Sequence, residues 1–247
     1  MERLSNDELQ KKLHDVTEQY KIIEETICGA AQESGRKRED IIFLAATKTV
    51  EPKVINHAVG CGLRYIGENR VQELLSKYGE YDLEHCELQF IGHLQTNKVR
   101  QIIDKVSMIQ SVDSLKLADE IDRQARIRNK VMNVLVEVNI GREENKSGVM
   151  PEQLEELLCQ IRDKQNISVK GLMAIPPVCT DKSSICKYFD NMYRIFIDIS
   201  AKKLDNISME HLSMGMSEDY REAILCGATM VRVGSALFGE RNYSKTN

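Results

Sequence analysis

Residues 131–140 read VMNVLVEVNI, a run in which apolar and β-branched side chains dominate. Such a run is typical of a strand that is buried on both faces. The stretch PEQLEELLCQIRDK at 151–164 opens with a proline, which suits a first helical turn, and is rich in Glu, Leu and Gln. Another apolar run, VKGLMA, occupies 169–174. Together these segments predict a strand–helix–strand unit of a parallel sheet.

The same alternation extends in both directions from this unit. Further strands are expected at 41–47, 64–67, 88–92, 107–112, 207–213 and 229–234. Further helices are expected from Glu51-Pro52, at 69–78, 96–105, 115–128, 183–203 and 218–226, and from Ala236 onward. Eight strands alternating with eight helices in 247 residues favour one closed α/β barrel of the TIM type, (β/α)8, over the alternative of a doubly wound open sheet. No Pro/Gly/Ser-rich linker divides the chain, so we expect a single domain over 1–247.

An extra helix is expected before the first strand. Its apolar positions follow a spacing of three and four residues, which lines one face of a helix. These positions are Leu9, Leu13, Val16, Tyr20, Ile23 and Ile27. Ser5 with Glu8 forms a capping-box pattern at the start, and Ser34-Gly35 is a stop signal.

Composition excludes several classes of protein. The net charge is −4 and the short basic runs sit beside acids, so no face for nucleic acid is expected. The seven Cys are odd in number and lack a C-x-x-C pair, and the five His do not cluster with them, which argues against disulfides and bound metal. The charged, polar start and the short apolar runs predict a cytoplasmic protein that does not enter a membrane.

Lys48 is the foremost candidate for chemistry. The carboxyl ends of the strands of a TIM barrel form its active site, and Lys48 directly follows the apolar run 43–47. A partly desolvated lysine has a lowered pKa and supplies the free amine that Schiff-base chemistry needs. The alternative is a lysine that simply extends to water. Other polar residues expected at strand ends are Glu68, Asn69, His93, Asn139 and Lys146.

The last two strands end in small residues that suit an anion. Gly215-Met216-Ser217 and Gly234-Ser235-Ala236 each lead from a strand into a helix. Helix starts present free N–H groups, and barrels often bind phosphate after strands seven and eight. Ordinary glycine turns are the alternative interpretation.

A lysine opposite a phosphate cradle suits two ligands, a phosphorylated sugar in a Schiff-base aldolase or pyridoxal 5′-phosphate (PLP). Arg232, inside the last strand, favours PLP because it could point at the ring nitrogen. A permanent cation there keeps that nitrogen unprotonated and weakens the ring as an electron sink. A salt bridge buried inside the barrel is the alternative role for Arg232.

Eight motifs in fixed order resemble one family. They are AATKT (45–49), YIGENRVQE (65–73), FIGHLQTNK (90–98), EVNI (137–140), KSG (146–148), GLMAI (171–175), LSMGMS (212–217) and RVGSALFG (232–239). Over nearly the whole chain they resemble the PLP homeostasis proteins, also called the YggS/PROSC family, which are alanine-racemase-like (fold type III) PLP barrels. The segment 175–184, with Pro176-Pro177 and Cys179, carries no matching motif beyond Ile175.

The resemblance implies a set of cofactor-binding residues. Lys48 would carry PLP as a Schiff base, with Asn69 near the ring and Arg232 facing the ring nitrogen. Ser217, Gly234 and Ser235 would hold the phosphate, and Met214 would form part of the pocket wall. The loop 141–148 would cover the pocket, with Lys146 as a second contact. His93 would lie at the mouth, either near PLP or in a structural hydrogen bond.

The resemblance also implies a role in vitamin B6 and amino-acid homeostasis rather than robust catalysis. Racemases need a base on each face of the substrate, and the second domain that supplies the other base in that family is not expected here. We therefore expect a monomeric PLP carrier, with PLP-dependent apo-enzymes as its partners. A weak PLP-dependent racemase or lyase predicts amino-acid turnover that stops in Lys48→Ala. A phosphosugar aldolase predicts no cofactor, and a pure interaction protein acting through its first helix predicts that Lys48→Ala leaves function intact.

Overall fold

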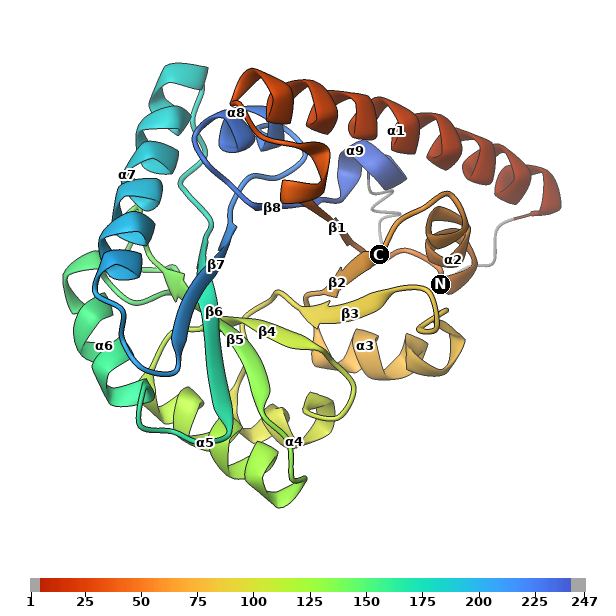
Figure 1. The fold of residues 1–247 in the computed structure, drawn as a ribbon. Helices are drawn as coiled ribbons and strands as arrows, with labels where there is room; N and C mark the ends of the chain where they lie inside the picture. Colours follow the sequence, from red (N-terminus) through yellow and green to blue (C-terminus); the bar gives the residue numbers. More distant parts are fainter. Residues whose placement is uncertain (1–4, 241–247) are drawn as a thin grey trace.

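Eight parallel strands close into a barrel in the computed structural model, which describes residues 5–240 (Figure 1). The strands pair in sequence order, and β1 pairs with β8 to complete the ring. Their bounds are β1 Ile42–Ala46, β2 Tyr65–Glu68, β3 Glu87–Phe90, β4 Met108–Val112, β5 Met132–Val138, β6 Ile167–Ala174, β7 Ile207–Ser213 and β8 Met230–Val233. The predicted (β/α)8 barrel is confirmed, and the doubly wound alternative is wrong because no sheet edge stays open.

A helix follows each strand on the outside of the ring (Figure 1). The helices are α1 Asn6–Glu33, α2 Pro52–Gly60, α3 Val71–Lys77, α4 Val99–Ile102, α5 Leu115–Ile127, α6 Leu154–Ile161, α7 Lys182–Ala201, α8 Tyr220–Leu225 and α9 Ser235–Phe238. Short 3-10 turns are η1 Arg38–Asp40, η2 Tyr78–Glu80, η3 Thr96–Lys98 and η4 Pro151–Gln153. Two predicted helices, 96–105 and 151–164, are shorter than expected: each begins with a 3-10 turn, and their α-helical parts end at Ile102 and Ile161.

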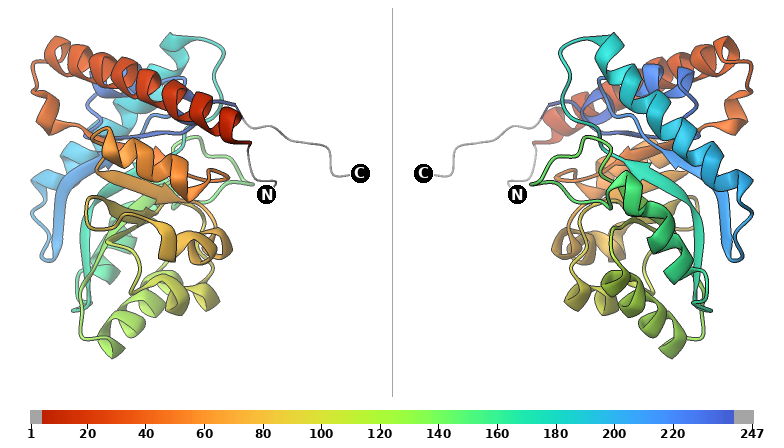
Figure 2. Two further views of the ribbon diagram at one scale, coloured as in Figure 1. Left: turned by 90° about the vertical axis from the view of Figure 1, so that its right-hand side faces the viewer. Right: turned by 90° about the vertical axis from the view of Figure 1, so that its left-hand side faces the viewer.

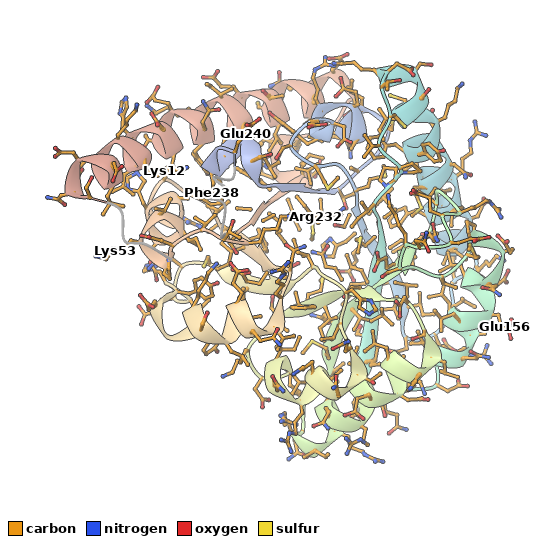
Figure 3. All side chains as sticks on the ribbon, turned by 180° about the vertical axis from the view of Figure 1, so that it is seen from behind. Lys12, Lys53, Glu156, Arg232, Phe238 and Glu240 are labelled. Carbon is orange, nitrogen blue, oxygen red and sulfur yellow. The ribbon has the colours of Figure 1, made fainter. Side chains whose placement is uncertain are left out.

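The extra N-terminal helix forms as predicted. Ser5 and Glu8 make the capping box, and the helix ends before Ser34 and Gly35, whose φ is +73°. Its apolar face packs against α2, α8 and α9, so α1 lies along the outside of the barrel (Figures 1 and 2). The Lys12 ammonium donates to the carbonyl of Phe238 and so ties α1 to α9 (Figure 3).

Most of the core lies between the barrel and its helices, where one large apolar cluster contains the outward side chains of the strands. The barrel interior holds two small clusters, Leu44 with Ile91 and Met230, and Met108 with Leu135 and Met173. The seven cysteines are free thiols, as expected. Within residues 5–240 no helix is long and apolar enough to cross a membrane, and no His/Cys/Asp/Glu group is suited to a metal ion.

Candidate functional site

Lys48 stands at a sharp turn just past the end of β1. Thr47 before it is fully buried and continues the sheet, since its amide donates to the carbonyl of Gly67 at 2.9 Å. Thr49 after it has a φ of +65°, which is costly for a β-branched residue. Lys48 itself is half-buried. The turn therefore places Lys48 at the carboxyl-terminal rim of the barrel.

Asn69 lies at the same rim, just past the end of the neighbouring strand β2. Its side-chain oxygen Oδ1 is buried and has no hydrogen-bond partner. Gly92, after β3, packs directly on the Asn69 backbone, because a Cβ on Gly92 would lie 2.1 Å from the Asn69 carbonyl oxygen. A buried acceptor without a donor is costly, so Asn69 Oδ1 is a candidate acceptor for a donor group of a ligand.

The loops after β7 and β8 meet around one hydroxyl. Ser217 Oγ accepts hydrogen bonds from the backbone N–H groups of Gly234, at 3.0 Å, and Ala236, at 3.2 Å. A Cβ on Gly234 would lie 3.2 Å from the carbonyl oxygen of Ala46, so this cradle also abuts the end of β1, two residues before Lys48. Two amide donors converging on one oxygen suit an anionic oxygen equally well.

The structure places the side chains of Ser235 and Met214, both predicted near the cradle, in different surroundings. The Ser235 side chain is exposed at the first position of α9. Met214 is fully buried, and its side chain belongs to the large cluster between barrel and helices. The Met214 amide donates to the carbonyl of Met230 at 3.1 Å, which joins the ends of β7 and β8.

Arg232 points into the barrel and is 4% exposed (Figure 3). Its guanidinium donates to Ser213 Oγ at 2.7 Å and to the Ala174 carbonyl at 3.0 Å. Burial lowers the pKa of Arg232 to about 10, while Glu137 and Asp219 act in the opposite direction. Neither of these two bonds goes to a carboxylate, so they do not form the buried salt bridge considered as the alternative.

A polar chain that the sequence did not reveal crosses the barrel interior. Arg232 donates to Ser213, whose hydroxyl donates to Gln110 Oε1 at 2.7 Å. The Gln110 amide in turn donates to Gln89 Oε1 at 2.6 Å. Near this chain lies Glu137, 7% exposed, where burial raises the carboxyl pKa to about 7.

The loop after β5 is folded on itself beside the mouth. Asn139 Nδ2 donates to the carbonyl of Glu143 at 2.9 Å, and Lys146 pairs with the Glu143 carboxylate at 2.7 Å. The exposed His93 ring lies 3.1 Å from Ser147 Oγ, which links the end of β3 to this loop. His93 thus makes a structural hydrogen bond, one of the two roles considered for it.

The sequence also did not reveal a charged cluster that lies beneath Lys48. Lys77, 3% exposed, pairs with Glu68 at 3.1 Å and with Glu73 at 2.6 Å. The Tyr81 hydroxyl donates to Glu68 Oε1 at 2.7 Å, and burial, together with the Glu68 charge, raises the pKa of Tyr81. The motif 65–73 contains Glu68 and Glu73, but the four-residue spacing of Glu73 and Lys77 is that of an ordinary exposed helix face.

One rim therefore gathers a lysine, an unsatisfied amide oxygen and a pair of amide donors, with an arginine below them. A planar ligand with an aldehyde, a hydrogen-bond donor on its ring and an anionic group would meet complementary chemistry at the lysine, the amide oxygen and the amide donors. Within residues 5–240 no group suits a metal ion.

Comparisons with known proteins identify relatives of this chain. Residues 52–242 match the family described as alanine racemase, N-terminal domain. A protein of Aquifex aeolicus called pyridoxal phosphate homeostasis protein is 45% identical over 219 residues, which cover 89% of this chain and 95% of that protein. The crystal structure of a Bifidobacterium adolescentis protein of unknown function has a TM-score of 0.87 at 32% identity, covering 96% of this chain and 98% of that one. The structure of PipY from Synechococcus elongatus with PLP bound has a TM-score of 0.76 at 30% identity, covering 86% of this chain and all (100%) of that one.

Proposed function

Because the chain belongs to the pyridoxal phosphate homeostasis proteins and matches the alanine racemase N-terminal domain, we propose that it holds PLP as a Schiff base on Lys48. In this role it keeps a reactive cofactor bound and serves vitamin B6 and amino-acid homeostasis inside the cell. The convergence of Lys48, Asn69 and the Ser217 cradle on one rim is the observation that carries the proposal.

Each group of the site has a task toward PLP. The amine of Lys48 would condense with the aldehyde carbon, and the aldehyde oxygen would leave as water. The N–H groups of Gly234 and Ala236 would bind a phosphate oxygen in place of Ser217 Oγ, and the hydroxyls of Ser217 and Ser235 would donate to the same phosphate. The buried Asn69 Oδ1 would accept a hydrogen bond from the ring hydroxyl. When bound, PLP supplies an aldehyde for amines and a ring that accepts electron density from a substrate carbon.

Arg232 supports a carrier rather than a strong catalyst. A guanidinium has five N–H donors, and the bonds to Ser213 and Ala174 use only some of them. The remaining donors can face the ring nitrogen. A group that stays cationic even with its pKa lowered to about 10 keeps that nitrogen unprotonated at neutral pH. The ring then withdraws electrons weakly, which suits storage and release of PLP.

A weak racemase or lyase is the second candidate, and Glu137 is the observation that favours it. Its carboxyl is buried inside the barrel and has a pKa of about 7, so it can both give and take a proton at neutral pH. Such activity would require Glu137 together with Lys48 as the two proton-handling groups.

One experiment separates the two functions. The PLP-loaded protein is mixed with a PLP-dependent apo-enzyme, and in parallel with D- or L-amino acids. The carrier proposal expects recovery of the apo-enzyme's activity and no amino-acid turnover. Turnover that disappears in both Lys48→Ala and Glu137→Gln would instead establish the enzyme. Failure of the protein to take up PLP at all would contradict both proposed functions.

We further propose that the carrier is cytoplasmic, acts as a monomer and has PLP-dependent apo-enzymes as acceptors.

A further inference from the structure

The backbone on both sides of Lys48 is tied to a single buried charged cluster, formed by Glu68, Glu73 and Lys77. Lys77 is the last residue of α3, where a lysine would ordinarily extend into water, yet it is 3% exposed. Glu68 is fully buried at the end of β2. We call these three residues the rim cluster.

On one side the rim cluster holds Thr47. The Lys77 ammonium donates to the Thr47 carbonyl oxygen at 3.0 Å, and the Thr47 hydroxyl donates to Glu68 Oε1 at 2.8 Å. The other two donors of the ammonium go to Glu68 and Glu73. All three of its N–H groups are thus satisfied, and the Thr47 peptide is fixed by a charge-assisted bond.

On the other side the rim cluster holds Thr49. The backbone N–H of Thr49 donates to Glu73 Oε1, the same oxygen that binds Lys77. Thr49 has a φ of +65°, a conformation that a β-branched residue adopts only when its surroundings impose it. The amide of this strained residue is bound by Glu73, and Glu73 is itself held by Lys77.

This arrangement is costly if stability is its only purpose. Glu68 and Lys77 are taken out of water, Glu73 is partly buried, and Glu68 Oε2 is buried without a hydrogen-bond partner. Apolar side chains of similar volume fill such a space at equal or lower cost. Desolvated charge, an unsatisfied oxygen and a strained residue all meet at the turn that carries the half-buried residue Lys48.

We propose that the rim cluster positions Lys48, with Glu73 as the positioning residue that fixes the turn and thereby sets how fast the Lys48 amine captures an aldehyde. This proposal rests on the proposed function, in which that aldehyde is PLP. A fixed turn holds the backbone of Lys48 in one position, so its Cα–Cβ bond has one direction. Fewer conformations of the side chain then lead away from the ligand. A loosened turn spreads the amine over many positions and slows its reaction.

The test compares Glu73→Ala with Glu73→Gln. Alanine removes the acceptor of the Thr49 N–H, whereas glutamine keeps an oxygen at the same place. A matched control is Glu24→Ala, which removes another partly buried carboxylate whose partner, Arg38, lies on η1. Denaturant unfolding first ranks the stabilities of the variants, so that a general loss of stability is recognised.

The first readout is the rate at which visible absorbance appears when PLP is added. We expect Glu73→Ala to be slower than wild type by a factor of about 10 to 100, with Glu73→Gln and Glu24→Ala close to wild type. The second readout needs no PLP. The protein is treated with trinitrobenzenesulfonate, an amine reagent, and labelling of Lys48 over time is followed by peptide mass mapping, with Lys53 on α2 as the internal reference. Labelling of Lys48 relative to Lys53 should change in Glu73→Ala and stay unchanged in Glu73→Gln.

Unchanged PLP capture and unchanged Lys48 labelling in Glu73→Ala would overturn the proposal. Equal slowing in Glu73→Ala and Glu24→Ala would also overturn it, because stability alone would then explain the effect. If wild type takes up no PLP while Lys48 labelling still changes only in Glu73→Ala, the proposed function fails and the positioning role stands.

Discussion

The hydroxyl oxygen of Ser217 lies 3.0 Å from the backbone nitrogen of Gly234, so the loop after β7 closes directly on the loop after β8. This contact turns two separate glycine-containing loops into one cradle. The same hydroxyl also accepts from Ala236, and the cradle lies against the end of β1 that leads to Lys48.

Ser217→Ala should weaken the binding of PLP by about tenfold or more. A hydrogen bond to a charged group contributes about 1.5 to 3 kcal/mol, and alanine cannot make it. Pyridoxal, which has no phosphate, serves as the control ligand because its affinity should change little. Equilibrium titrations of both ligands measure the effect, and an equal loss for the two would show that Ser217 does not bind phosphate.

Gly92→Ala should destabilise the fold by more than about 2 kcal/mol and should disturb PLP binding. The new Cβ would lie 2.1 Å from the carbonyl oxygen of Asn69, which would have to move. Gly79→Ala is the matched control, since a Cβ at Gly79 would have no heavy atom within 4 Å. Urea unfolding and PLP titration measure both variants, and similar behaviour of the two would contradict the close packing at Asn69.

Glu137 should make stability depend on pH. Burial raises its pKa from 4.5 to about 7, with a further contribution from Asp113, so the folded protein binds this proton more tightly than the unfolded chain does. The stabilisation is complete below the unfolded pKa of 4.5 and is lost as the pH rises through about 7. Glu137→Gln has no such loss and should be more stable than wild type above about pH 8, by up to about 3 kcal/mol.

The free energy of unfolding of wild type and Glu137→Gln, measured in urea across this pH range, tests that expectation. A difference between the two proteins that stays constant with pH would mean that the Glu137 carboxyl has an ordinary pKa in the folded state.

The sequence predicted the barrel and most strand positions because long apolar runs separated by helix signals leave few alternatives. The ends of elements were less predictable. The expected strand 131–140 stops at Val138, because the Asn139 backbone N–H donates to the Val149 carbonyl at 2.9 Å instead of to a neighbouring strand. Helix α4 covers only Val99–Ile102, since a 3-10 turn precedes it.

The candidate site was partly predictable for a geometric reason. Carboxyl ends of parallel strands must meet at one rim, so Lys48, Asn69, Ser217 and Gly234 were expected together, and Arg232 inside the last strand was expected below them. The rim cluster could not be expected in the same way. Glu73 and Lys77 are four residues apart on a helix, a spacing normally found on exposed faces, and only the tertiary fold buries them.

The central claim is that PLP attaches to Lys48, and borohydride reduction followed by peptide mass mapping tests it most directly. The protein is incubated with PLP, reduced and digested, and the mass of reduced PLP is located on the peptides; Lys48→Ala and Lys53→Ala are treated in the same way. We predict one modified site, Lys48, in wild type and in Lys53→Ala. In Lys48→Ala we predict no modified residue at position 48 and no loss of visible absorbance upon reduction. A yellow wild-type protein whose reduced PLP maps elsewhere, or a protein that acquires no PLP at all, would contradict the account.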